Sequence, residues 1–388
     1  MQNLCFRCKG RNWCNKCKIL EEIKKVTPKV GLEFSGYSQD LFVGKFGYPN
    51  VFTGALASVN KIVEQATSEN WFERKMSIAE IISARGSLIH PRFISNIKAG
   101  SRLLGIVQEV AMAKIPCDIE FQLKKKPLFK IKIDTISAPI GNPAPMKNAK
   151  LQENPRISKK VEYVVDDTDL KASEAIIGLH SGSISVSSIT RILSAGLVGI
   201  KSQRKLVPTR WAITAVDSLI SNNFIKKIKG YSWLNEFLVF NGEFLGNHYE
   251  ILLLPREWSF EVLETNGGFF MVDYEDFFGR KDYAKEVSGA YYTNRLAVCE
   301  YLERIKKQAG ALVLREVKQE YWVPCGVGIL REVTRNAFVK SGIKFTSLKE
   351  ALDNIQSRLE IPITEFIKRS NLLKGMEQKK LGSFTQAH

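Results

Sequence analysis

The sequence lacks any apolar run of the roughly 18 residues that a membrane-spanning helix requires. Its first residues include cysteines and lysines at the place where a secretory signal peptide has an apolar segment. Cysteine is scarce, with seven in 388 residues, and four of the seven lie in two closely spaced pairs. In a reducing compartment, such pairs favour a metal site over disulfides. We therefore expect a soluble, cytoplasmic protein.

Several widespread enzyme signatures are missing as well. The chain has no Walker-type glycine-rich phosphate loop, which argues against chemistry driven by ATP. It has neither the G-x-S-x-G turn of α/β-hydrolases nor the H-E-x-x-H pair of zinc proteases. Any catalytic activity would therefore depend on a less common arrangement of residues.

Acidic residues are in deficit, because 40 aspartates and glutamates stand against 57 lysines and arginines, a formal net charge of +17. A positive field favours polyanionic partners, first nucleic acid and second an acidic membrane surface. The stretches KSQRKLVPTR and KKIK indicate a phosphate-binding face, and an ordinary solvated helix surface is the alternative. The candidate nucleic-acid contacts in these stretches are Lys201, Arg204, Lys205, Lys226 and Lys227.

Near the N-terminus, the segment CFRCKGRNWCNKC contains a C-x2-C-x5-C-x2-C pattern. A C-x2-C pair lets one tight turn present two thiolates to a single ion, and two such pairs complete a tetrahedral zinc shell. A redox dithiol and an iron–sulfur cluster are alternative uses of the same cysteines. The predicted ligands of a structural Zn²⁺ are Cys5, Cys8, Cys14 and Cys17.

Basic and aromatic side chains alternate with these cysteines. Such a mixture suits contact with phosphates together with stacking on a base. A knuckle that only stabilises the fold is the alternative. The candidate nucleic-acid contacts in the knuckle are Arg7, Lys9, Arg11 and Trp13.

The last residues contain the pattern Q-x-x-L-x-x-F, formed by Gln378, Leu381 and Phe384. A single tight helical turn would place the leucine and the phenylalanine on one side, where they could fill a hydrophobic pocket. The pattern resembles the tag with which a disordered segment docks on the DNA sliding clamp. An ordinary frayed tail is the alternative.

Between the two ends, strands and helices are mixed without regular βαβ alternation, which predicts an α+β body. The segments GYSQDLFVGKFGYPNVFTGAL and CDIEFQLKKKPLFKIKID predict strands, and residues 234–273 predict a β-meander of four strands. A long helix is expected at residues 289–308. Ser347 and Glu350 predict a capping box at the start of a later helix.

The stretch SAPIGNPAPMKNAKLQENPRISKK carries four prolines and predicts an extended linker or long loop. No internal repeat is apparent. We therefore divide the chain into a knuckle at 1–20, an N-terminal part of the body at 21–150, a C-terminal α+β part at 160–373 and a disordered tail at 374–388.

Several long and unusual segments resemble the archaeal Nre family, and the resemblance covers nearly the whole chain. They are the four-cysteine start, FVGKFGYPNV, GLHSGSISVSSITRIL, RKLVPTRWAITAVDS, GAYYTNRLAV, LREVKQEYW and the terminal motif. The resemblance implies a role in DNA-damage repair, a zinc finger, and recruitment by the sliding clamp (PCNA). Many clamp motifs end in two aromatic residues, whereas Thr385 follows Phe384 here, which predicts a lower affinity. The resemblance carries no catalytic residues to this chain.

Two catalytic hypotheses remain beside an adaptor without activity. The stretch GLHSGSISVSSITRILSAGL loosely resembles the nicotinamide-side element of ADP-ribosyltransferases, a histidine at a strand end followed by a turn and a short helix. There His180 would hold the ribose of NAD, Arg210 would meet a pyrophosphate, and Glu316 would polarise the acceptor. A purely structural histidine is the alternative.

The second catalytic hypothesis is a Mg²⁺-dependent nuclease. In LREVKQEYW, Glu316 and Lys318 form an E-x-K pattern near a strand end, with Asp273 or Asp276 as the further carboxylate. Any exposed strand can carry such a pattern. An enzyme should gather His180 or Glu316 with Arg210 around a cavity, whereas a clamp-tethered adaptor need not.

Overall fold

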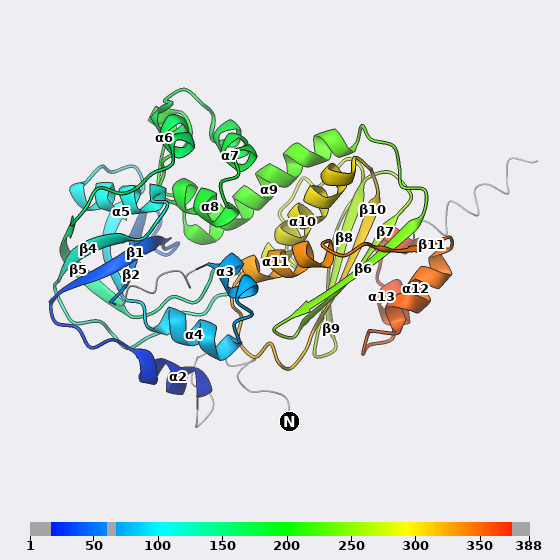
Figure 1. The fold of residues 1–388 in the computed structure, drawn as a ribbon, viewed down its shortest axis with the longest axis horizontal. Helices are drawn as coiled ribbons and strands as arrows, with labels where there is room; N and C mark the ends of the chain where they lie inside the picture. The colour runs from blue at the N-terminus through cyan, green and yellow to red at the C-terminus, as the bar shows by residue number, and fades with distance from the viewer. Residues whose placement is uncertain (1–16, 60–66, 375–388) are drawn as a thin grey trace, which may run out of the picture. The chain divides into compact units, whose positions relative to one another are not determined.

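The computed structural model describes residues 17–59 and 67–374, and Figure 1 shows the order of its helices and strands. By their contacts the residues form two compact units. The first unit comprises Met1–Ile220 with Trp322–Ile329, and the second comprises Ser221–Tyr321 with Leu330–His388. Two of the three divisions fall inside helices, α9 (Thr209–Ile228) and α11 (Val327–Ala337), and the third lies between Tyr321 and Trp322, before α11.

The centre of the first unit is a closed five-stranded barrel with the order β1-β2-β3-β5-β4. Strands β3 and β5 pair in parallel, and the other neighbours are antiparallel. A helix, α5 (Arg102–Met112), separates β3 from β4 in the chain and packs on the barrel. This is the arrangement of an OB-fold. The strands are β1 (Glu33–Val43), β2 (Asn50–Ser58), β3 (His90–Asn96), β4 (Cys117–Leu123) and β5 (Pro143–Leu151).

The barrel interior follows from the alternation of its strands. In β4, Ile119 and Phe121 are buried and their neighbours are more exposed, which confirms the first of the two strands predicted in CDIEFQLKKKPLFKIKID. The second, expected after Pro127, is wrong, because this stretch forms a loop in which Lys132 makes only an isolated bridge with Ile140. Ala55 of β2 and Val110 of α5 join the same core. Gly54 is required on β2, since a Cβ there would lie 1.9 Å from the carbonyl oxygen of Pro91.

One expectation about this unit is corrected. The proline-containing stretch predicted as a linker contains β5, which pairs with both β3 and β4. Its prolines do not interrupt the sheet, because Pro143 and Pro145 lie at the start of the strand, where fewer ladder hydrogen bonds are needed.

Short helices complete the first unit, and serine side chains begin several of them. Ser77 and Glu80 form a full capping box at the start of α4. The remaining helices of this unit are α2 (Lys18–Val26), α3 (Ser68–Glu73), α4 (Ile78–Gly86), α6 (Lys159–Asp166), α7 (Ala172–Ser181) and α8 (Val186–Ser194), with a 3-10 turn, η1 (Lys201–Gln203).

The segment Trp322–Ile329 belongs to the first unit, although it lies in the chain between the two parts of the second. The backbone N–H of Val327 donates to the carbonyl of Ile136 at 2.9 Å. Gly326 adopts a positive φ of 86°, and a Cβ there would lie 2.8 Å from the backbone nitrogen of Ala138. The segment is thus fitted closely against the chain between β4 and β5.

The second unit is built on a six-stranded sheet of order β11-β6-β7-β10-β8-β9. The four strands expected between residues 234 and 273 are present, but they do not form a simple meander. Strand β10 lies between β7 and β8, antiparallel to the first and parallel to the second. The strands are β6 (Phe237–Phe244), β7 (Asn247–Leu254), β8 (Ser259–Asn266), β9 (Phe269–Glu275), β10 (Gly310–Val317) and β11 (Ile343–Phe345).

The expected long helix is α10 (Gly289–Ile305), which leads into β10. Two further helices are α12 (Leu348–Gln356) and α13 (Ile363–Ile367). The capping box expected at α12 is half formed: the Ser347 hydroxyl accepts the Glu350 N–H, while the Glu350 carboxylate accepts from Thr346 instead. Mixed helices and strands in both units agree with the predicted α+β class.

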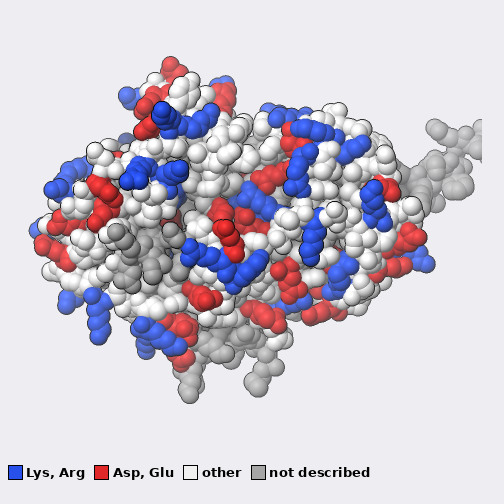
Figure 2. Space-filling view, in the orientation of Figure 1, with Lys and Arg blue, Asp and Glu red and all other residues white. Residues whose placement is uncertain are grey.

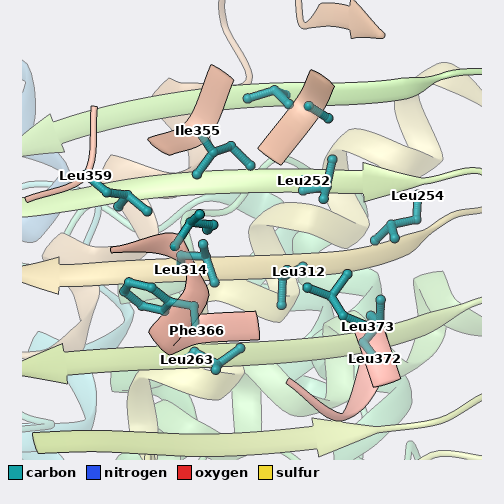
Figure 3. Close-up of a cluster of buried hydrophobic side chains, with 13 residues drawn as sticks. Leu252, Leu254, Leu263, Leu312, Leu314, Ile355, Leu359, Phe366, Leu372 and Leu373 are labelled. Carbon is teal, nitrogen blue, oxygen red and sulfur yellow. The ribbon is translucent and has the colours of Figure 1, made fainter. Parts of the chain in front are cut away.

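A leucine-rich core joins one face of this sheet to the C-terminal helices (Figure 3). Leu252, Leu312 and Leu314 point from neighbouring strands toward Ile355 and Phe366 of α12 and α13. Each of these side chains is at most 1% exposed. Complete burial of a Leu or Phe contributes about 1.5–3 kcal/mol, so the burial of these five side chains anchors the C-terminal helices. Within the described residues no helix is long and apolar enough to cross a membrane.

Candidate nucleic-acid interface

The outer surface of β2 and β3 exposes apolar side chains that a closed barrel does not need to expose. Phe52 of β2 lies opposite Ile94 of β3, and their exposed fractions are 39% and 63%. Beside them, the side-chain amide of Asn96 donates to that of Asn50 at 3.0 Å. We call the surface formed by these strands and by the two loops described next the barrel face.

The loop between β1 and β2 adds further exposed rings. Phe46 is 70% exposed and Tyr48 is 42% exposed. Trp211, in the first turn of α9, is 45% exposed, and its ring centroid lies 5.4 Å from that of Tyr48. The loop turns at Gly47, which has a φ of +81°. Aromatic side chains from two segments far apart in the sequence therefore lie on this part of the first unit.

Cations lie against these rings. The guanidinium of Arg92 is 4.2 Å from the ring centroid of Phe52. Lys132, in the loop between β4 and β5, places its Nζ 5.1 Å from the ring of Phe42 and 5.3 Å from that of Phe46. Lys45 lies 5.3 Å from the same Phe46 ring. Among the residues that the structure describes, Lys45, Arg92 and Lys132 form no ion pair, so their charge is not neutralised within the fold.

The charges around Lys132 act on the pKa of its ammonium group. Burial lowers this pKa, the Asp134 carboxylate opposes the change, and the positive charges of Lys45, Arg210 and Arg92 lower it further. Asp134 is itself engaged by Arg210 at 2.7 Å. One carboxylate therefore stands among four cations. Such a cluster attracts an anion that would relieve the repulsion.

The loop between β4 and β5 carries more positive charge before Lys132. Its first half, KKKPLFK, exposes lysines, and Leu128 and Phe129 are 62% and 41% exposed. The exposed lysines of this half are Lys124, Lys125, Lys126 and Lys130. Both loops that flank the β2–β3 surface are therefore basic and aromatic. In OB-folds this surface and its flanking loops bind oligonucleotides or oligosaccharides, and the positive charge here favours the anionic oligonucleotides.

Net charge alone would not have located this face. Figure 2 shows lysines and arginines interspersed with aspartates and glutamates over the side of the molecule that it draws. What distinguishes the barrel face is local: cations without carboxylate partners, next to exposed rings. That combination is typical of surfaces that bind single nucleic-acid strands.

Most residues predicted at the two ends of the chain lie outside the described residues. These are Cys5, Cys8, Cys14, Arg7, Lys9, Arg11, Trp13, Gln378, Leu381 and Phe384. Cys17 is described: its side chain is 5% exposed, and its carbonyl accepts the N–H of Glu21 at 3.0 Å at the start of α2. The zinc site and the clamp motif stay predictions.

The basic residues predicted in the body fall on both units. Lys201 and Lys205 are exposed, but the Arg204 guanidinium donates to the carbonyls of Gly199, Val165 and Asp167 at 2.6–2.9 Å. Arg204 therefore has a structural role, and it could bind a phosphate only by giving up some of these hydrogen bonds. In the second unit, Lys226 and Lys227 are exposed at the end of α9, and Lys227 lies 3.7 Å from Glu303.

The expected secondary structure around His180 is wrong. His180 lies in the last turn of α7 and not at a strand end, because residues 172–181 form a continuous helix. The adjoining serines and Arg191 of α8 border a cavity of about 320 Å³ in the first unit. Neither His180 nor Arg210 lines this cavity. The arrangement expected of an ADP-ribosyltransferase pocket is therefore not seen there.

The carboxylates of the nuclease hypothesis are engaged by the fold. Glu316 of β10 accepts the backbone N–H groups of Glu360 and Ile361 at 3.1 and 2.8 Å. Lys318 pairs with Glu243 at 2.9 Å, and Asp273 accepts two backbone N–H groups at 3.1 and 2.7 Å. Among the described residues there is no group of three His, Cys, Asp or Glu that could hold a metal ion. NAD and Mg²⁺ chemistry stay untested predictions.

The barrel face was missed from the sequence although its signal is present. Basic and aromatic residues alternate in both KFGYP and KKKPLFKIK. Both segments were predicted to be strands, and that prediction does not show that they form two loops on either side of one surface. Only the fold brings Lys45, Arg92 and Lys132 together from three distant segments.

Two family descriptions together match most of the chain. The one described as "Archaeal Nre, N-terminal" matches residues 10–267, and the one described as "Archaeal Nre, C-terminal" matches residues 275–384. No solved structure matches the chain.

Three relatives match most of its length. The chain is 35% identical to "DNA repair protein NreB" of Archaeoglobus fulgidus, over 98% of this chain and 99% of the relative. It is 36% identical to "DNA repair protein NreA" of the same organism, over 92% and 94%. It is 32% identical to "DNA repair protein NreA" of Haloferax volcanii, over 89% and 87%.

Proposed function

This chain belongs to the archaeal Nre family, and on that premise we propose that it is a DNA-repair protein that binds DNA through the barrel face. The relatives that it matches over most of their length are named DNA repair proteins. Work on DNA requires at least one surface that holds its backbone. The net charge of +17 supports such contact in general.

The observation that carries this proposal is the meeting of Lys45, Arg92 and Lys132 without ion pairs, beside exposed rings. Their mutual repulsion is relieved when a phosphate lies among them. Neutralising phosphates with lysine and arginine releases counterions from DNA, so affinity falls as salt rises. The DNA backbone would therefore run over the barrel face, between the loop after β1 and the loop after β4.

A salt titration tests this proposal. Removing both charges in a Lys45→Ala/Lys132→Ala variant should make the log–log dependence of DNA affinity on salt shallower by about 1.4–1.8, measured by fluorescence anisotropy. The matched control is Lys147→Ala/Lys150→Ala, which removes two exposed lysines from β5 of the same barrel. An unchanged slope in the first variant would exclude the barrel face as the DNA contact.

The C-terminal motif would recruit the protein to the sliding clamp. Gln378, Leu381 and Phe384 have the spacing of a clamp-docking tag. A tether of this kind raises the local concentration of the barrel face at DNA without requiring a high intrinsic affinity. A Leu381→Ala/Phe384→Ala variant should lose binding to an archaeal clamp, measured by surface plasmon resonance. A Lys379→Ala/Lys380→Ala variant, altered between the motif residues, should keep it.

The four N-terminal cysteines would hold a structural zinc ion. Cys17 fits this role, because its side chain is buried at the start of α2 and forms no capping hydrogen bond there. Zinc would then fix the knuckle to α2. Elemental analysis should find zinc in the purified chain and a loss of it in Cys5→Ser/Cys14→Ser. Iron in place of zinc would favour the cluster alternative.

A further inference from the structure

The rings of the barrel face are placed where nucleobases could lie on them. Phe46, Tyr48 and Phe52 are all more than a third exposed, and Trp211 extends the set beside Tyr48. Single exposed apolar residues are ordinary on protein surfaces, but a cluster marks a binding site. Rings of this kind bind flat, apolar partners by stacking.

The cations next to these rings are placed to contact the phosphate of a nucleotide whose base stacks on the ring. Arg92 lies over Phe52, while Lys45 and Lys132 lie beside Phe46. A base stacked on either ring would bring its own phosphate within reach of these cations. Each ring with its cation therefore provides contacts for both the base and the backbone of one nucleotide.

A DNA duplex cannot use such a surface in the same way. In a duplex the bases are stacked on each other, and only their edges are accessible in the grooves. Reading those edges takes an element that enters a groove, such as a helix or a β-ribbon. The barrel face instead presents rings on the outer surface of two paired strands and on a short loop. Unpaired bases can lie on such rings, whereas paired bases cannot.

We infer that the barrel face is selective for single-stranded DNA and that Phe46 and Phe52 stack on its bases. This inference rests on the proposed DNA binding and names the form of DNA that is bound. Stacking on an aromatic ring tolerates any base, so little sequence preference is expected. The protein would thus act where repair has exposed a single strand.

The test compares three labelled oligonucleotides of about 16 nucleotides by fluorescence anisotropy: a single strand, the duplex of the same sequence, and an abasic strand with the same phosphates. The wild-type chain should bind the single strand at least about tenfold more tightly than the duplex or the abasic strand. Phe46→Ala and Phe52→Ala should each weaken binding of the base-containing strand about 5- to 100-fold. Neither change should affect the abasic strand.

Controls separate stacking from a loss of structure. Phe46 is the more exposed of the two residues, so Phe46→Ala removes the least packing. Phe52→Tyr keeps a ring and should retain binding. Tyr163→Ala removes a 71% exposed ring from α6 and should leave all three affinities unchanged.

The possible failures can be distinguished. Absence of binding to any of the three oligonucleotides would overturn the proposed function itself. Equal binding of duplex and single strand, or equal losses on the base-containing and abasic strands, would overturn the inference and leave DNA binding intact. Tighter binding of an RNA strand of the same sequence would overturn the assignment to DNA.

Discussion

In the second unit, Arg358 donates two hydrogen bonds of 2.7 Å to the carboxylate of Glu250, which is completely buried. In the first unit, Lys132 lies half-buried among Lys45, Arg92 and Arg210, with the Asp134 carboxylate already engaged by Arg210. In the second unit these charged groups pair with each other inside the fold. In the first unit, Lys45, Arg92 and Lys132 form no ion pair among the described residues, so their positive charge is available to a ligand. The difference supports the proposal that the first unit contacts DNA.

Two carboxylates of the second-unit sheet, Glu261 and Glu316, are buried and have a structural role. Glu261 accepts hydrogen bonds from Ser370, Asn371 and Leu372, and Glu316 accepts two backbone N–H groups. Each of these groups is buried and fully engaged, as a buried charge must be. An acidic residue on a strand is therefore weak support for catalysis until its partners are known.

Breaking a buried pair of the second unit should give the largest effect. Arg295 lies 2.7 Å from Glu275, and both side chains are at most 6% exposed. Arg295→Ala would leave the Glu275 carboxylate buried and uncompensated, at a cost of about 3–5 kcal/mol of unfolding free energy in chemical denaturation. Lys344→Ala breaks an exposed pair with Glu236 and should cost less than about 1 kcal/mol. Equal costs would remove the contrast between structural and surface charges.

The histidine of the barrel should make the first unit sensitive to acid. Burial lowers the pKa of His90 to about 3, and the charges of Arg92, Arg85 and Lys132 add to the effect. Since the folded state resists protonation, stability is complete above the unfolded pKa of 6.5 and is lost as pH falls toward 3. His90→Gln should flatten this dependence in denaturation curves taken between pH 7 and pH 4. A parallel pH dependence in both proteins would contradict the assignment.

His248 of the second unit should make stability depend on pH in the opposite direction to His90, and by a smaller amount. Burial lowers the pKa of His248, but hydrogen bonds to Glu250 and Glu243 outweigh it and raise the pKa overall. Its stabilisation is therefore complete below the ordinary pKa of 6.5 and is lost as pH rises through the raised value. His248→Gln should destabilise the protein more at pH 6 than at pH 8. A larger loss at pH 8 would contradict this prediction.

Removing a cation from the barrel face should have the smallest effect on stability. Burial and neighbouring cations lower the pKa of Lys132, so its charge costs free energy in the folded state. Lys132→Met should change the unfolding free energy by less than about 1 kcal/mol, in the stabilising direction. The same variant should bind DNA more weakly. A clear loss of stability would assign Lys132 a structural role like that of the second-unit charges.

Much of the strand content could be predicted from the sequence, because alternation and turn residues are local signals. CDIEFQL predicted β4, and the segments between residues 234 and 273 predicted β6 to β9. The position of β10 between β7 and β8 could not be predicted, because pairing depends on segments far apart in the chain. The pairing of β5 with β3 could not be predicted for the same reason, and the prolines of β5 favoured the prediction of a linker.

The site was less predictable than the fold. Each loop of the barrel face carries a basic and aromatic signal, but the signal gains meaning only when barrel closure brings Arg92 beside Phe52 and Lys132 beside Phe46. The predicted body contacts illustrate the converse, because Arg204 looks free in sequence and is engaged by three carbonyls. The cysteine and clamp motifs need no fold to be recognised, and they stay predictions.

The return of Trp322–Ile329 to the first unit has a consequence for synthesis of the protein. Val327 and Gly326 lie against the segment Ile136–Ala138, just after Lys132 and Asp134 in the chain. A ribosome must translate Ser221–Tyr321 before it reaches these residues, which takes about 5–20 s at ordinary rates of elongation. During that interval the segment Ile136–Ala138 lacks its contacts with Gly326 and Val327. The chain between β4 and β5, which carries Lys132, therefore gains these contacts only after most residues of the second unit have been translated.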